Sequence, residues 1–215
     1  MSEKRITTDD LETATELSEN EAKLCYATQL AWRWHGQQTR KGRTTPYMSH
    51  LLQVQGLVIA HGGNSAQAIA ALLHDALEDA ESPADRAERE ATIQSEFNPT
   101  VLRIVLDCTD TTSDEAGAIK GPWRERKERY IAQLTAAEAD SLLVAACDKR
   151  HNLGDLIVDL RAEGLSTFTR FTAGPNEQLW YFENLEALFR SRVPDPLASE
   201  LTNLLVEFRA FVEQS

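Results

Sequence analysis

The order of apolar and polar residues along the chain predicts helices almost everywhere and strands almost nowhere. No stretch sustains the apolar-polar alternation of a strand, and the Asn-Gly and Asp-Gly pairs of β-hairpins are absent. Apolar residues instead recur at helical spacing behind residues that favour helix starts. We therefore predict an all-α fold of about eight to ten helices. The main helices are expected over 18–35, 46–59, 64–77, 98–108, 122–134, 137–161 and 176–192, with a last one ending near 212.

Short signals set the boundaries of these helices. Ser18 and Glu21 have the spacing of a capping box, and Gly164 stops the longest helix. Pro194 and Pro196 bracket a break before the last helix.

The chain contains no internal repeat and no low-complexity linker. Two long polar loops are expected over 37–45 and 109–121. We expect a flexible tail over 1–18, followed by one helical domain over 19–215.

Composition and charge narrow the range of partners. The net charge is −12, which disfavours binding to a nucleic-acid backbone. The longest apolar run, 51–60, is too short and too interrupted to cross a membrane, and the polar N-terminus is not a signal peptide. Three scattered cysteines suit a reducing cytoplasm, with each serving as a small core residue. Homo-oligomerisation is left open by these features.

Positive charge nevertheless gathers in two short clusters. The first lies in the loop before residue 46 and contains Arg40, Lys41 and Arg43. The second spans 120–129 and contains five basic residues beside two glutamates. Basic islands on an acidic protein suggest a local site for a small phosphorylated ligand, although solvated surface charge explains the second cluster equally well.

The pair His74-Asp75, followed by Glu78-Asp79, is the first candidate for chemistry. If the predicted helix continues to residue 77, His74 stands over Glu78 and Asp75 over Asp79. Three carboxylates this close repel one another unless a cation neutralises them. A solvated helix end is the alternative, but the preceding residues are apolar, as in a core.

Two further residues complete a candidate metal set. His50 lies on the preceding predicted helix, which can fold back beside His74, and Asp148 interrupts an apolar stretch where a carboxylate is costly to bury without a partner. Two imidazoles and two carboxylates suit Mn²⁺, Fe²⁺, Co²⁺ or Zn²⁺.

With these residues in order, the chain resembles the HD superfamily of metal phosphohydrolases, whose pattern is His, then His-Asp, then Asp. More narrowly, it is similar to the hydrolase domain of RelA/SpoT homologues in the stand-alone form called small alarmone hydrolases. The resemblance covers about 21–190. Its matching stretches are His35-Gly36-Gln37, Arg40-Lys41, Pro46-Tyr47, Ala70 to Asp75, Glu78-Asp79, Cys108-Thr109-Asp110, Arg126-Lys127 with Tyr130, Asp148-Lys149-Arg150 and Asn152-Leu153.

The resemblance implies an enzyme that removes the 3′-pyrophosphate from guanosine tetra- and pentaphosphate with one bound divalent metal, Mn²⁺ above all. It implies that Glu78 and Asp79 orient or deprotonate the attacking water. The implied metal ligands are His50, His74, Asp75 and Asp148. The candidate substrate-binding residues are Arg40, Lys41, Lys149, Asn152, Asp155 and Tyr181.

Some features depart from the family pattern or carry no assigned role. Leu51 follows the first metal histidine where the family has proline, and Asp155 stands where alarmone hydrolases often have threonine. The stretch after Arg190 is too short for a synthetase domain, so we expect only degradation of the nucleotide. His61 and His151 are expected at the surface or in caps.

Two other functions stay open. One is a metal-dependent phosphatase acting on another nucleotide, such as a nicotinamide dinucleotide phosphate, a deoxynucleotide or an adenosine alarmone. The other is a non-catalytic nucleotide-binding module, which the intact metal set and the intact Glu78-Asp79 pair disfavour.

Overall fold

The computed structural model describes residues 17–110 and 121–213, and these residues form α-helices joined by turns. Over this part of the chain the only β-type pairing is an isolated bridge between Thr39 and Pro46. The all-α prediction is confirmed. The helices are α2 (Glu19–His35), α3 (Met48–Ala60), α4 (Ser65–Leu73), α5 (Pro83–Glu96), α6 (Pro99–Cys108), α7 (Trp123–Ala136), α8 (Ala139–Glu163), the 3-10 helix η2 (Gly164–Arg170), α9 (Pro175–Phe189) and α10 (Asp195–Glu213).

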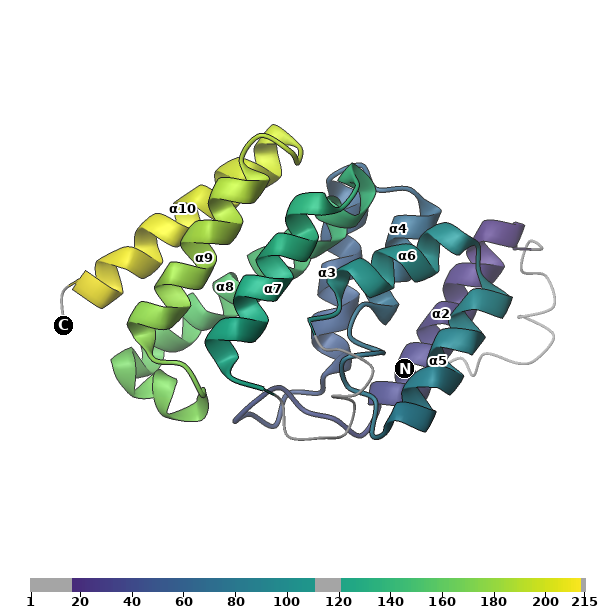
Figure 1. Cartoon of the computed structure of the whole chain (residues 1–215), viewed down its shortest axis with the longest axis horizontal. Coiled ribbons are helices and arrows are strands. Elements are labelled where there is room, and N and C mark those ends of the chain that lie inside the picture. Colours follow the sequence, from purple (N-terminus) through teal and green to yellow (C-terminus); the bar gives the residue numbers. More distant parts are fainter. Residues whose placement is uncertain (1–16, 111–120, 214–215) are drawn as a thin grey trace, which may run out of the picture.

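Helix α4 lies at the centre of one half of the molecule, packed against α2, α3, α6 and α8 (Figure 1). Its residues from Gln67 to Leu73 are all buried, as expected for a helix that is apolar on every side. The long helix α8 also packs against α9 and α10, which form the opposite end of the molecule from α2 and α5. A polar residue on the inner face of α3, α4 or α8 is therefore held inside a rigid core.

Local sequence signals set several helix ends as expected. Ser18 and Glu21 form the capping box of α2, and Asn64 caps α4 together with Gln67. The predicted stop of α8 at Gly164 is confirmed, and this glycine has a φ of 63°, which favours a residue without a Cβ.

Other boundaries differ from the predictions. Helix α4 ends at Leu73 rather than at Leu77, and 74–79 form consecutive turns. Helix α5 was not predicted, although Ser82 caps it and Pro83 occupies its first turn. Pro196 does not break the chain before α10 but lies in its first turn, where its missing N–H costs nothing.

The expected N-terminal tail and the loop over 109–121 lie mostly outside the described residues. In the described part of the chain, no helix combines the length and the apolar character needed to cross a membrane. Cys108 and Cys147 are buried as expected, but Cys25 is exposed, so the expectation of a core role is wrong for that residue.

Candidate metal centre and adjoining pocket

Three segments bring the four candidate metal ligands together. His50 comes from α3, His74 and Asp75 from the turn after α4, and Asp148 from the middle of α8. The Nε2 atom of His50 lies 3.3 Å from His74 Nε2 and 3.3 Å from Asp148 Oδ1. Asp75 Oδ2 lies 3.1 Å from His74 Nε2 and 3.5 Å from His50 Nε2. The four side chains thus converge on one point, although 98 positions separate His50 from Asp148 along the chain (148 less 50).

These distances fit a set of ligands around one ion. Ligand atoms bound about 2.0–2.2 Å from a metal lie about 3–3.5 Å from one another. His50, His74 and Asp148 each offer one ligand atom, and these three atoms lie within 4.8 Å of one another. All three residues are buried. Buried imidazoles and carboxylates are a suitable donor set for a divalent metal.

The charges of the cluster point the same way. Burial by itself would lower the pKa of His74, but the carboxylates of Asp75 and Asp148 raise it well above its usual value. Burial would raise the pKa of both aspartates, yet His74, His50 and Lys149 hold them well below their usual range. The carboxylates therefore stay ionised and attract a positive charge. When no metal is bound, protonated His74 supplies that charge.

A second layer of side chains orients the four ligands. Tyr47 donates a 2.6 Å hydrogen bond to Asp75, the ammonium of Lys149 contacts Asp148 at 2.6 Å, and Asn152 donates to Asp148 at 2.5 Å. Each ligand carboxylate is thus fixed by hydrogen bonds from neighbouring side chains, as in many metal sites.

His151 belongs to this layer too, so the expectation of a surface or capping role is wrong. It is buried, and its Nδ1 lies 3.0 Å from Nδ1 of His50. Burial and the nearby His50 lower the pKa of His151 to about 4, so its ring is neutral at pH 7. One of the two nitrogens therefore donates the shared hydrogen bond and fixes the ring of His50.

Glu78 and Asp79 lie half-buried beside the cluster, at the end of the 74–79 turn. The predicted helix does not continue through them, because α4 stops at Leu73. Asp79 is instead placed by its backbone N–H, which donates to the carbonyl of Asp75 at 3.0 Å, and by its carboxylate, 3.6 Å from His35 Nδ1. The charge of Glu78 helps to raise the pKa of Lys127 on α7. Glu78 therefore acts on a residue of the pocket described next.

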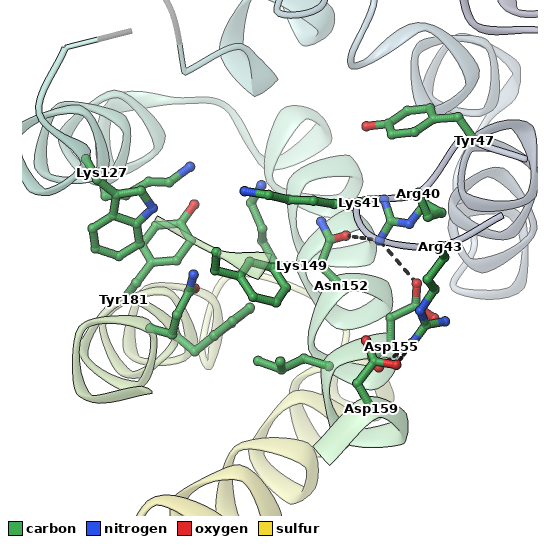
Figure 2. A pocket seen from close by; sticks show the side chains of 15 residues that line it. Arg40, Lys41, Arg43, Tyr47, Lys127, Lys149, Asn152, Asp155, Asp159 and Tyr181 are labelled. Atoms are coloured by element: carbon green, nitrogen blue, oxygen red, sulfur yellow. Dashed lines mark hydrogen bonds and ion pairs between the residues drawn. The ribbon is translucent and has the colours of Figure 1, made fainter. Parts of the chain in front are cut away.

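A pocket of about 310 Å³ adjoins the cluster. All six candidate substrate-binding residues line it, together with further residues from α7, α8, α9 and the loop before α3. Figure 2 shows Lys41, Lys127 and Lys149 pointing into this space from three different elements. The wall residues are Arg40, Lys41, Arg43, Tyr47, Trp123, Lys127, Lys149, Asn152, Asp155, Leu156, Asp159, Phe171, Gln178, Tyr181 and Phe182.

The charges in this pocket are arranged in two groups. On the wall formed by α8, Asp155 pairs with Arg40 at 3.1 Å and Asp159 pairs with Arg43. Near Asp148 and Tyr181, Lys149 and Lys127 are cationic, because neighbouring acids and tyrosines raise the pKa of both above its usual value despite burial. These two lysines are paired as well, Lys149 with Asp148 and Lys127 with Asp110.

Several pocket residues had no role assigned from the sequence. The sequence pattern assigns no ligand contact to Trp123, Lys127, Phe171 or Gln178, all of which line the pocket. The ring of Trp123 packs edge-on against Tyr181, with 5.8 Å between ring centroids. Of these residues, Lys127 could have been identified from the sequence, because it belongs to the second basic cluster and to the Arg126-Lys127 stretch.

The chain is similar to proteins of known families. Residues 27–177 match the HD domain family. The human protein named guanosine-3′,5′-bis(diphosphate) 3′-pyrophosphohydrolase MESH1 is 33% identical over 138 residues, which are 63% of this chain and 70% of the human protein. The protein of that name from Drosophila melanogaster is 30% identical over 141 residues, 64% of this chain and 72% of the fly protein.

Two solved structures share the fold. A metazoan orthologue of SpoT, described as hydrolysing ppGpp, superposes with a TM-score of 0.68 at 24% identity, covering 90% of this chain and 98% of the other. A protein from Listeria monocytogenes gives a TM-score of 0.59 at 24% identity and covers 73% of this chain and 96% of its own. The helical fold of this chain is thus shared with both.

Proposed function

We propose that this chain, which belongs to the HD domain family, is a Mn²⁺-dependent hydrolase that removes the 3′-pyrophosphate from guanosine tetra- and pentaphosphate. The observation that carries the proposal is the convergence of His50, His74, Asp75 and Asp148 beside a pocket lined with cations. Relatives that are named for this activity and cover about two thirds of this chain support the same substrate.

The four ligands fit a divalent ion in donor type, spacing and charge. When bound, such an ion polarises a phosphoryl oxygen and lowers the pKa of water. His50 and His74 supply neutral imidazoles for it, and Asp75 and Asp148 supply charge. Tyr47, His151 and Lys149 keep these side chains in place while the substrate enters and leaves.

Glu78 and Asp79 carry the proton transfer in this proposal. They follow the ligands His74 and Asp75 in the same turn without being ligands themselves, which leaves their carboxylates able to accept a proton from the attacking water. Lys127 and Lys149 line the pocket, Lys149 in contact with the ligand Asp148, and both bind the negative charge of the pyrophosphate. Both lysines are fully protonated at pH 7, since the pKa of each is raised.

The nucleoside then lies toward α8 and the loop before α3. Asn152 and Asp155 offer hydrogen-bonding groups there, Lys41 reaches over the pocket, and Tyr181 offers an aromatic face from α9 (Figure 2). We assign this activity to a single domain over 19–215 that acts in the cytoplasm on a free nucleotide.

A product assay with the purified, Mn²⁺-loaded protein tests the proposal. Guanosine tetraphosphate and pentaphosphate are compared with the adenosine counterpart, a nicotinamide dinucleotide phosphate and a deoxynucleoside triphosphate, and products are separated by anion exchange. The expected result is release of pyrophosphate, with GDP or GTP, from the two guanosine substrates. The His74→Ala protein is the control for contaminating activity. Preferred release of phosphate from another nucleotide would replace the substrate assignment but keep the reaction class.

A further inference from the structure

The turn that carries His74, Asp75, Glu78 and Asp79 is not held by helical hydrogen bonds alone. Two arginines of α5 reach back to it: Arg89 donates through Nη1 to the carbonyl of Ala76 at 2.9 Å, and Arg86 donates through Nη1 to the carbonyl of Leu77 at 3.2 Å. Both arginines are only 6% exposed, although arginine is rarely buried without a specific partner.

These contacts lie where the backbone most needs them. Because α4 ends at Leu73, the carbonyls of Ala76 and Leu77 lie beyond its regular helical hydrogen bonds. Ala76 and Leu77 are fully buried and immediately precede Glu78 and Asp79. An unpaired carbonyl at such a buried position destabilises the fold, and the two guanidinium groups supply the missing hydrogen bonds.

Arg89 is itself firmly held. Its Nε and Nη2 atoms contact both carboxylate oxygens of Asp85 at 3.0 and 2.7 Å, and its guanidinium carbon lies 5.6 Å from the ring centre of Trp34. Because a two-point ion pair and an aromatic ring hold this guanidinium, its remaining N–H group has a fixed orientation. The carbonyl of Ala76 lies in that direction.

We propose that Arg86 and Arg89 are positioning residues that set the direction of the Glu78 and Asp79 carboxylates by fixing the two peptide groups before them. The inference rests on the proposed function, in which those carboxylates take up the proton. It assigns to α5 a part in the reaction, although α5 contributes no residue to the metal cluster and none to the pocket wall.

The test uses Arg89→Met and Arg86→Met, which keep much of the length and apolar contact of each side chain but remove its donors. We expect kcat to fall by about tenfold to a hundredfold, as for small displacements of a reacting group. KM should stay within about twofold, and metal content should stay at the parent level, because neither the pocket nor the ligands lose a contact.

Arg192→Met is a matched control. Arg192 also donates to backbone carbonyls at a helix end, those of Leu134, Thr135 and Ala137 at the end of α7, but it contributes nothing to the metal cluster or the pocket wall. This variant should lose stability with its kcat unchanged. An equal fall of kcat in Arg192→Met, or unchanged kcat in both α5 variants, would overturn the positioning role.

Hydrogen exchange separates this inference from the proposed function. Mass spectrometry should find faster amide exchange over 74–80 in Arg89→Met than in the parent, with α8 unchanged. That readout needs no substrate, so it remains informative if the parent protein leaves guanosine tetraphosphate intact, a result that would contradict the proposed function alone. Unchanged exchange over 74–80 in both α5 variants would contradict the positioning role alone.

Discussion

Arg40 is paired with Asp155 on the wall of the pocket, with 3.1 Å between Nη2 and Oδ2, and the same nitrogen donates to Asn152 at 2.8 Å. The positive charge of Arg40 is therefore offset by a carboxylate before any ligand arrives. This wall suits the donor groups of a nucleoside better than it suits a phosphate. Arg40, a candidate for binding the phosphates, is thus paired instead with Asp155, the residue that departs from the family pattern.

The pairing predicts how Asp155→Asn changes substrate choice. Removing this charge leaves Arg40 uncompensated and should raise the preference for guanosine pentaphosphate over tetraphosphate by about threefold to tenfold, because one charge in a half-exposed site changes binding by about 1 kcal/mol. The measurement is kcat/KM for both substrates. Asp140→Asn, which breaks the Asp140–Arg103 pair away from the pocket, is the control. An unchanged ratio in Asp155→Asn would mean that Asp155 does not act on the ligand.

Glu78→Gln and Asp79→Asn should separate catalysis from folding. Each keeps the shape of the side chain and removes its capacity to accept a proton, so turnover should fall by about a hundredfold. Metal content and melting temperature are measured alongside the rate and should match the parent. Near-normal turnover in both variants and in the double variant would exclude these carboxylates from the proton transfer.

Bound metal should stabilise the folded protein measurably. A ligand that binds only the native state at a hundred times its Kd adds about 2.7 kcal/mol to the free energy of unfolding. Thermal melts of chelator-treated protein, with and without Mn²⁺, should therefore show a clear upward shift of Tm. His74→Ala should abolish the shift and Glu78→Gln should keep it. Equal Tm values for the parent with and without divalent metal would contradict the metal site.

His151 should affect metal binding through His50. The Nδ1–Nδ1 hydrogen bond of 3.0 Å fixes the ring of His50, so His151→Phe should weaken metal affinity by about tenfold to a hundredfold. His151→Asn places an amide group near the position of the lost nitrogen and should restore most of the affinity. Competition with a chelator of known affinity measures both. Equal loss in the two variants would indicate a packing role instead.

Asp110 predicts a pH dependence of stability. Burial would raise its pKa, but Lys127 and Arg126 lower it from 3.8 to about 2. A carboxyl with a lowered pKa in the folded state adds stability above its unfolded pKa, and this contribution is lost as the pH falls from about 4 toward 2. Its size is about 2 kcal/mol, since one pKa unit corresponds to 1.36 kcal/mol.

Urea unfolding of the parent and of Asp110→Asn tests this pH dependence. The variant should be less stable by that amount at pH 7, and the difference should shrink below pH 4. A constant difference between pH 7 and pH 3 would show that Asp110 acts by packing alone.

Much of this protein follows from the sequence because the relevant forces act between near neighbours. Helix caps such as Ser18 with Glu21 involve residues three apart, and the apolar periodicity follows from the helical repeat. The order of His50, His74-Asp75 and Asp148 was enough to identify a candidate ligand set, because few chains bury such residues without a cation to neutralise the acids.

The tertiary structure decided what depends on contacts between distant segments. After α4 ends at Leu73, two arginines of α5, a helix that was not predicted, donate to the backbone carbonyls that follow. The residues 64–77 alone do not predict these contacts. The pairings of His151 with His50 and of Asp155 with Arg40 join residues 101 and 115 positions apart. A helical pattern predicts which face of a helix is buried but not which side chains of other helices it contacts. In this protein those contacts set the charge of the pocket and the orientation of the metal ligands.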